Sequence, residues 1–451
     1  MADLLTLSAR IIDSGVADEP VNRVTQELSE LAEGIALVES FSHVVVIDTD
    51  DGLVCFDTSG SLTGAAVVES IRRWRSGPFR SLVYTHGHVD HVGGSGAFLA
   101  DARTAGRPDP EVIGHENVAV RMDRYDRTNG YNSIINARQF GGVRGNLGIG
   151  GTSRFLPADA LRPSVEVGAR TTLHVGGLHL DLRHARGETD DHLWAWLPEQ
   201  RALCTGDFLI WNFPNAGNPQ KVQRYPLEWA RALRDMAALD AELLLPAHGL
   251  PIAGVDRIRG VLDDVATALE RLVADVLEAM NAGETLDAIV HSVRVDPDLL
   301  AKPYLRPLYD EPEFVVRNVW RLYGGWYDGD PSHLKPAPAA AFAAELAGLA
   351  GGPGALAVRA RELAEAGDLR LACQLVELAV QAAPDDAGAH AARAEIYGVR
   401  RKQESSLMAK GIYGWAQRQS LEASGATGED LARERATDPD RSGLRPRRPG
   451  T

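Results

Sequence analysis

A dense group of possible metal ligands, placed directly after an apolar run, constrains this chain more than any other feature. The segment Thr85-His86-Gly87-His88-Val89-Asp90-His91-Val92-Gly93-Gly94 follows the strand-like run Ser81-Leu82-Val83-Tyr84. Imidazole nitrogens and carboxylate oxygens are the ligands that zinc and similar divalent ions take. The alternative is a polar loop of ordinary hydrogen-bonded histidines, but so dense a cluster would be costly to bury without partners. The sequence therefore predicts a metal site at the end of a strand.

The overall charge narrows the classes of partner. The chain has 451 residues with 47 basic and 62 acidic side chains, which gives a net charge of −15. A balance this acidic argues against nucleic acid or an anionic membrane as the partner. It leaves room for a small anionic substrate, which responds to the local field and to a metal.

Cysteine usage and hydrophobic patterning point to a reducing compartment. The three cysteines, Cys55, Cys204 and Cys373, are too far apart in the sequence for a disulfide framework or a zinc motif of paired cysteines. The first residues show no signal-peptide pattern, and no run of 18 apolar residues occurs. We therefore expect a cytoplasmic protein without a membrane span.

The pattern of apolar residues divides the chain into three parts. Two β-rich runs joined by an Asp-Gly turn predict a hairpin over residues 43–57, and helical and strand-like patterns then alternate to about residue 255. Residues 256–400 are helical in pattern, with short helices near a tetratricopeptide rhythm at 355–365, 369–383 and 387–399. We therefore predict an α/β domain over 1–255, a helical domain over 256–400, and a polar tail over 401–451 that is largely disordered from about 424.

The histidine-rich segment resembles the metallo-β-lactamase superfamily, in which the pattern His-x-His-x-Asp-His occurs at this point of an αββα sandwich. The resemblance requires a bridging acid in a Gly-Asp pair after a later strand, and a last histidine after another strand. Gly206-Asp207 follows Leu203-Cys204-Thr205, and His248 follows Leu243-Leu244-Leu245-Pro246-Ala247. Both requirements are met in the correct order.

The resemblance also requires a ligand between these segments, and here the chain is unusual. Superfamily members typically read His-Thr-Pro-Gly-His-Thr, whereas this chain reads His184-Ala185-Arg186-Gly187-Glu188-Thr189-Asp190-Asp191-His192. The register places Glu188 at the ligand position, while His184 or His192 remains an alternative. A glutamate ligand would make the site harder and more anionic than three histidines do.

A glutamate at this position is similar to the alkyl sulfatase-type members of the superfamily. Those members carry a helical dimerisation domain with a signature near Gly-Trp-Tyr-Asp-Gly-Asn-Pro, and this chain has Gly325-Trp326-Tyr327-Asp328-Gly329-Asp330-Pro331. The resemblance covers roughly residues 35–400. It implies a mixed α/β fold, an αββα sandwich followed by an all-α dimerisation or tetratricopeptide-like domain, and a homodimer.

The resemblance implies two zinc ions per chain. His86, His88 and Glu188 would hold one ion, Asp90, His91 and His248 the other, and Asp207 would bridge them. Asp90 and Asp207 would be the catalytic carboxylates, with Asp90 orienting the attacking water. Asp57 matches an early aspartate that supports the histidine loop, although it could equally be a turn residue at a strand end.

The segment expected to bind the substrate departs from the family pattern. Alkyl sulfatase-type members have Ala-Glu-Asn where this chain has Gly206-Asp207-Phe208, and their sulfate-binding pattern is not reproduced over residues 211–224. Residues 121–142 would form a substrate flap or a plain surface loop. The candidate substrate-binding residues are Tyr131, Asn215, Asn218, Lys221, Arg224 and Tyr309.

Three functions are compatible with these observations. The first is a dinuclear zinc hydrolase that cleaves alkyl sulfate esters with metal-activated water. The second is a metallo-hydrolase of another ester, a lactone or a phosphoester, which the altered 211–224 segment favours. The third is an iron-dependent redox member of the superfamily or a binding protein with a silent site. The sequence leaves open the substrate, the native metal, the bond that is cleaved and the pathway.

Overall fold

The computed structural model describes residues 3–140 and 154–427, which form two compact units. The first unit comprises residues 3–133 and 154–326 of the described chain, and the second comprises residues 134–140 and 327–427. Each unit has a hydrophobic core of its own.

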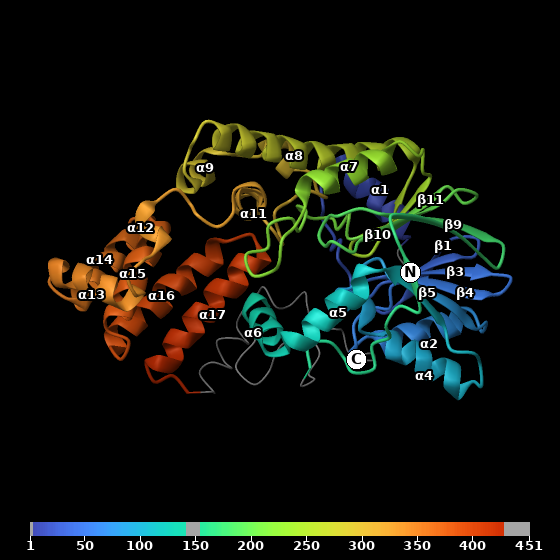
Figure 1. The fold of residues 1–451 in the computed structure, drawn as a ribbon, viewed down its shortest axis with the longest axis horizontal. Helices are drawn as coiled ribbons and strands as arrows, with labels where there is room; N and C mark the ends of the chain where they lie inside the picture. Colours follow the sequence, from blue (N-terminus) through green and yellow to red (C-terminus); the bar gives the residue numbers. More distant parts are fainter. Residues whose placement is uncertain (1–2, 141–153, 428–451) are drawn as a thin grey trace. The chain divides into compact units, whose positions relative to one another are not determined.

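The first unit contains two β-sheets (Figure 1). One sheet has the order β1 (Leu28–Ala32), β2 (Ile35–Val38), β3 (Val44–Thr49), β4 (Gly52–Phe56), β5 (Phe79–Val83), β6 (Glu111–His115) and β7 (Val165–Val167). The other has the order β13 (Ile252–Ala253), β12 (Leu243–Pro246), β11 (Ala202–Gly206), β10 (Leu193–Leu197), β9 (Leu178–His184) and β8 (Arg170–Val175). The predicted hairpin is confirmed, because β3 and β4 pair antiparallel across the turn before Gly52.

Alternating side chains explain how the first sheet is covered on both faces. In β3, Val45 and Ile47 enter the core shared with the second sheet, whereas Val44 and Val46 enter a core on the opposite face. Successive side chains of a strand point to opposite faces, so a run of valines buries both. This run therefore lies inside a layered structure and not at its surface.

Helices cover the outer face of each sheet. The first sheet packs against α2 (Gly64–Trp74) and α4 (Ser95–Thr104), and the second against α1 (Leu4–Ser14) and α8 (Val255–Asn281), with α7 (Pro226–Ala237) beside α8 (Figure 1). The result is the αββα sandwich that the sequence predicted. The first unit also contains α3 (Val89–Val92), α5 (Asn117–Arg127), α9 (Leu286–Ser292), α10 (Pro297–Leu300) and α11 (Pro312–Gly324).

The second unit is entirely helical where it is described. It holds the end of α6 (Asn129–Gln139) and the helices α12 (Pro331–Leu334), α13 (Ala339–Ala350), α14 (Pro353–Glu365), α15 (Leu369–Ala382), α16 (Ala387–Gln403) and α17 (Leu407–Ala423). Alanine dominates its core, which allows close approach of the helices. The three short helices expected in this region are confirmed.

Two predictions about the domains need correction. The predicted boundary at residue 255 is the start of α8, but the compact units divide between Trp326 and Tyr327, because α8 packs on α7 and the second sheet. The polar tail predicted from residue 401 is wrong for residues 401–423, because α16 continues to Gln403 and α17 follows over Leu407–Ala423 with Met408 fully buried. The tail from 428 onward lies outside the described residues.

Within the described ranges, no single helix combines the length and the apolar composition needed to cross a membrane. The pair α13 and α14 meets the requirement only when its two helices are taken together, and they are bent by 82° at their junction.

Candidate metal centre

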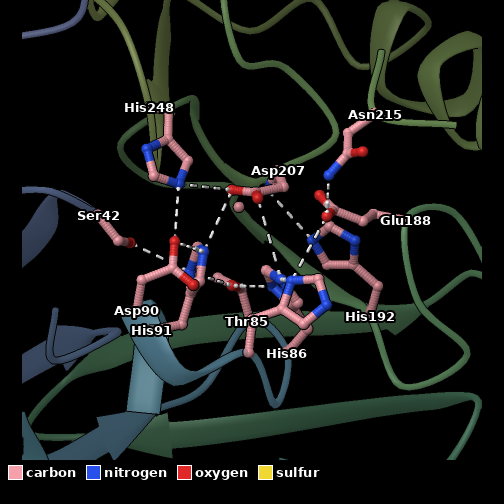
Figure 2. A network of polar contacts seen from close by, with 12 residues as sticks. Ser42, Thr85, His86, Asp90, His91, Glu188, His192, Asp207, Asn215 and His248 are labelled. Atoms are coloured by element: carbon pink, nitrogen blue, oxygen red, sulfur yellow. Dashed lines mark hydrogen bonds and ion pairs between the residues drawn. The ribbon is translucent and has the colours of Figure 1, made fainter. Parts of the chain in front are cut away.

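The candidate metal ligands come from the ends of strands in both sheets. His86 and His88 follow β5, Asp90 and His91 lie on α3, and Glu188 lies between β9 and β10. Asp207 follows β11, and His248 follows β12. Loops at the ends of strands are free to carry functional side chains because the sheets fix their bases. The structure thus brings together all seven residues that the sequence singled out. Figure 2 labels each of them except His88.

The seven side chains form two groups. His86, His88, Glu188 and Asp207 each offer a ligand atom within 4.8 Å of the others, and Asp90, His91 and His248 do the same. In the first group His86 Nε2 lies 2.8 Å from His88 Nδ1, and His88 Nδ1 lies 3.4 Å from Glu188 Oε1. These are the two groupings that the resemblance implied for two ions.

Asp207 lies between the groups (Figure 2). Its Oδ2 is 3.9 Å from His86 Nε2, and its Oδ1 is 3.5 Å from His91 Nε2 and 3.6 Å from His248 Nε2. Each carboxylate oxygen therefore faces a different group. This is the arrangement that a bridging carboxylate needs.

Unsatisfied buried atoms show that the donor set fits divalent cations. His91 Nε2, Asp207 Oδ1 and Glu188 Oε2 are buried and have no hydrogen-bond partner. Burial raises the pKa of Glu188 well above its usual value, which reflects the cost of a carboxylate with too little positive charge nearby. Burial also lowers the pKa of His86 and His88, so both are neutral imidazoles, as metal binding requires. A divalent cation in each group would satisfy these atoms.

Asp57 supports the histidine loop. Its Oδ1 accepts a hydrogen bond from the Thr85 backbone N–H at 2.8 Å, and its Oδ2 lies 2.8 Å from both Thr85 Oγ1 and His91 Nδ1. A carboxylate on Nδ1 fixes the ring and leaves Nε2 directed at the ligand group. Asp57 has a φ of 61° at the end of β4, so the left-handed backbone and the supporting contact occur together.

His184 and His192, the alternatives to Glu188 as metal ligand, make contacts outside the two ligand groups. His184 Nε2 bonds the Asp190 carbonyl at 3.0 Å, and its ring stacks on His115. His192 Nε2 accepts from the Asp207 backbone N–H at 3.2 Å, and its ring stacks on Phe208. Among the three candidates, only Glu188 enters a ligand group.

Three of the predicted substrate residues, Asn215, Asn218 and Arg224, are buried and form hydrogen bonds with other residues of the protein. Asn215 donates to Glu188 Oε1, and Arg224 donates to the Glu188 carbonyl. Asn218 is buried and its Oδ1 accepts from the Gln220 backbone N–H at 3.2 Å. Asn215 and Arg224 therefore hold a candidate ligand in place.

The other three predicted substrate residues, Lys221, Tyr309 and Tyr131, differ in their surroundings. Lys221 is half-buried with Nζ 5.5 Å above the Phe155 ring, and burial followed by the charge of Arg224 lowers its pKa to about 8. Burial, then the charges of Glu188 and Asp90, raise the pKa of Tyr309 well above its usual value. Tyr131 lies on α6 with an exposed side chain. Residues 121–142, predicted as a flap or a surface loop, are mostly helix up to residue 140, and residues 141 and 142 lie outside the described residues.

Sequence reasoning missed several residues that support the site. Asp191 accepts from the Gly87 backbone N–H at 3.1 Å and from Arg121 Nε at 2.8 Å, so it fixes the turn between the first two histidines. His43 Nε2 contacts the Gly249 carbonyl at 2.8 Å, next to His248. Both contacts join segments far apart in the sequence, and neither residue lies in a local motif.

Two family models match this chain in succession. The model of the metallo-beta-lactamase superfamily matches residues 37–248, and the model named alkyl sulfatase dimerisation matches residues 285–422. The first contains every residue of the two ligand groups. The second extends through α17, in agreement with the helical structure there.

Relatives with established names are alkylsulfatases. A linear primary-alkylsulfatase from a Pseudomonas strain is 28% identical over 361 residues, 76% of this chain and 67% of the relative. An (R)-specific secondary-alkylsulfatase from Pseudomonas sp. is 26% identical over 392 residues, 82% of this chain and 59% of the relative. This chain thus spans between 56% and 67% of the length of such relatives.

A solved structure shows the same fold. The stereoselective inverting sec-alkylsulfatase Pisa1 from Pseudomonas sp. superposes with a TM-score of 0.77 at 23% identity, over 93% of this chain and 67% of that chain. Residues 37–248 form a domain of the metallo-β-lactamase superfamily, and the grouped ligands lie within it. Residues 285–422 form an alkyl sulfatase dimerisation domain, so the chain combines two domains in the order that the sequence analysis expected.

Proposed function

We propose that this protein is a metal-dependent hydrolase of sulfate esters that acts on alkyl sulfates and works with two zinc ions per chain as a homodimer. One observation carries the proposal: two groups of buried or half-buried ligand atoms lie on either side of the Asp207 carboxylate, in a chain whose named relatives are alkylsulfatases. The matched dimerisation domain supports the homodimer.

The residues at the site have distinct roles in this proposal. Bound divalent ions would supply Lewis acidity, which activates water and neutralises negative charge on the ester. Asp90 has a side chain that is 22% exposed, against 8% for Asp207 and 3% for Glu188. It is therefore the carboxylate of the site that reaches solvent, and its Oδ2 is placed to orient a water molecule and accept its proton. Lys221 offers a positive charge to the sulfate group.

One observation favours a second candidate, the hydrolysis of another ester, a lactone or a phosphoester. Asn215 and Arg224, which the sequence offered as sulfate ligands, are engaged by Glu188. The sulfate-binding pattern of the alkyl sulfatase-type members is thus replaced at these positions by support for a candidate metal ligand.

Metal analysis combined with an assay of sulfate release tests the proposal. Purified protein is analysed for zinc and iron and then incubated with octyl sulfate below its micellar concentration, with octyl acetate and 4-nitrophenyl phosphate in parallel. We expect about two zinc ions per chain, and sulfate release that a chelator abolishes and His88→Ala greatly reduces. Zinc-loaded protein that cleaves only the acetate or the phosphate would overturn the sulfatase assignment. Bound iron with visible absorbance would overturn the zinc assignment.

A further inference from the structure

The loop between β11 and α7 runs past Glu188 and is fixed from the other side by a distant part of the chain. Asn215 Nδ2 donates to Glu188 Oε1, and Arg224 Nη1 donates to the Glu188 carbonyl. Arg224 Nη2 also lies 3.4 Å from Glu188 Oε1. The second carboxylate oxygen, Oε2, is left without a hydrogen-bond partner. The loop therefore holds Oε1, which lies 3.4 Å from His88 Nδ1, and so fixes the orientation of the carboxylate within its ligand group.

Asp310 fixes the first half of this loop. Its Oδ2 accepts from the backbone N–H groups of Gly217 at 2.6 Å and Asn218 at 3.1 Å, and its Oδ1 accepts from the N–H of Glu311 at 2.8 Å. The side chain is fully buried. All three partners are donors, so only a group with two acceptor oxygens satisfies them. An isosteric asparagine would direct its NH₂ at one or more of these N–H groups.

Asn318 on α11 fixes the second half. Its Nδ2 donates to the Arg224 carbonyl at 3.0 Å, and its Oδ1 accepts from Gln223 Nε2 at 2.9 Å and from the Arg224 N–H at 3.3 Å. Asn318 and Arg224 are both almost completely buried. Both the N–H and the carbonyl of Arg224 are thus bonded to the Asn318 amide, which holds the backbone from which the Arg224 side chain reaches Glu188.

Close packing leaves this loop little freedom to shift. A Cβ on Gly217 would lie 2.5 Å from backbone atoms of Phe314 and Val315, at the start of α11. The loop and the 310–318 segment are therefore in direct backbone contact. A displaced loop would have to move α11 as well.

We propose that Asp310 and Asn318 are positioning residues for the metal site, acting through Asn215 and Arg224 to aim Glu188 at the ion shared with His86 and His88. The inference rests on the proposed metal centre but not on the identity of the ester. It assigns to residues within the matched dimerisation segment, 285–422, a role in the site formed by residues 37–248. The alkyl sulfatase-like catalytic domain is then incomplete without that segment.

Cobalt titration of the full-length protein tests the inference, because the absorbance of bound Co²⁺ reports each site without any substrate. Apo wild type and the variants Asp310→Asn, Asn318→Ala and Glu188→Gln are titrated. Asp264→Asn is the matched control: Asp264 is a carboxylate on α8 bonded to Lys302 and Tyr304, and it has no contact with the loop among those the structure describes. Unfolding temperatures of the apo proteins are measured in parallel.

We expect both Asp310→Asn and Asn318→Ala to weaken one of the two cobalt sites by about 10–100-fold, the range typical for residues that orient ligands. The same site should be lost in Glu188→Gln, and the other site should keep its affinity. Asp264→Asn should lower the unfolding temperature without changing either affinity. Two sites of unchanged affinity in a folded Asp310→Asn or Asn318→Ala would overturn the inference, as would a parallel loss at both sites. Wild type that binds cobalt but releases no sulfate would refute the sulfatase proposal alone.

Discussion

At the scale of single residues, the site is defined by how each histidine and carboxylate is held. The Nδ1 atom of the His91 ring is hydrogen-bonded to Asp57, and its Nε2 atom faces Asp207 and Asp90. Burial by itself would lower the pKa of His91, but the three carboxylates outweigh burial and raise it. Three carboxylates thus surround one imidazole, and this excess of carboxylate oxygens favours divalent ions over neutral partners.

Replacement of Glu188 should remove one ion. We expect Glu188→Ala to lower bound zinc from about two to about one per chain, because the first group loses its glutamate. His184→Ala is the matched control, since His184 is engaged by the Asp190 carbonyl and by the His115 ring. Metal analysis after gel filtration measures the difference. Loss of zinc in His184→Ala, with none in Glu188→Ala, would show that the ligand has been assigned to the wrong residue.

His43 should make the stability of the protein depend on pH. Burial lowers its pKa to about 4 from 6.5, so between these values the unfolded chain binds the extra proton and the folded chain does not. The free energy of unfolding should therefore fall as the pH is lowered from 6.5 to 4, by up to about 3 kcal/mol from this residue.

Urea unfolding of the chelator-treated protein at several pH values measures this effect. His43→Gln keeps a donor for the Gly249 carbonyl and removes the titrating group, so its pH dependence should be shallower than that of wild type. His291→Gln, on an exposed turn of α9, serves as the control. Equal slopes for His43→Gln and wild type would contradict the prediction.

At the scale of elements, the sequence predicted the ligands that directly follow an apolar strand and missed the contacts between segments that are distant in the sequence. The histidine segment, the Gly-Asp pair and His248 each follow an apolar strand, so position along the chain was sufficient to find them. The role of Arg224 was not predictable, because its contacts depend on Asn318, which lies 94 residues later. Helix α17 was missed because its buried face includes Gly411, Gly414, Arg418 and Ser420, which give no apolar periodicity.

The packing of α17 gives a prediction for the second unit. A Cβ on Gly411 would collide with the carbonyl oxygen of Gln139 on α6, so Gly411→Ala should destabilise this unit by about 1–3 kcal/mol. Gly348→Ala on α13 is the control, because its added Cβ meets nothing within 4 Å and should be neutral or mildly stabilising. Thermal unfolding followed by circular dichroism measures both. A stable Gly411→Ala variant would show that α6 and α17 are not in close contact.

At the scale of the whole molecule, the helical second unit has many exposed apolar side chains. Phe342, Leu349 and Val358 on α13 and α14 are more than half exposed. The two helices pack against each other, and exposed apolar side chains that gather on neighbouring elements mark surfaces that associate. We expect a dimer in sedimentation velocity at micromolar concentration, and we expect Leu349→Glu with Phe342→Glu to shift it toward the monomer. A wild-type monomer at that concentration would refute the proposed homodimer.

The division of the ligands between the two sheets has a kinetic consequence. His86, His88, Asp90 and His91 follow a strand of one sheet, whereas Glu188, Asp207 and His248 follow strands of the other. An ion held by such a set links the sheets across the sandwich as a covalent crosslink would. The sheets can then separate only after the ion has left, so the unfolding rate of the loaded protein should be governed by metal dissociation. Metal exchange in the cell would in that case set the lifetime of the folded chain.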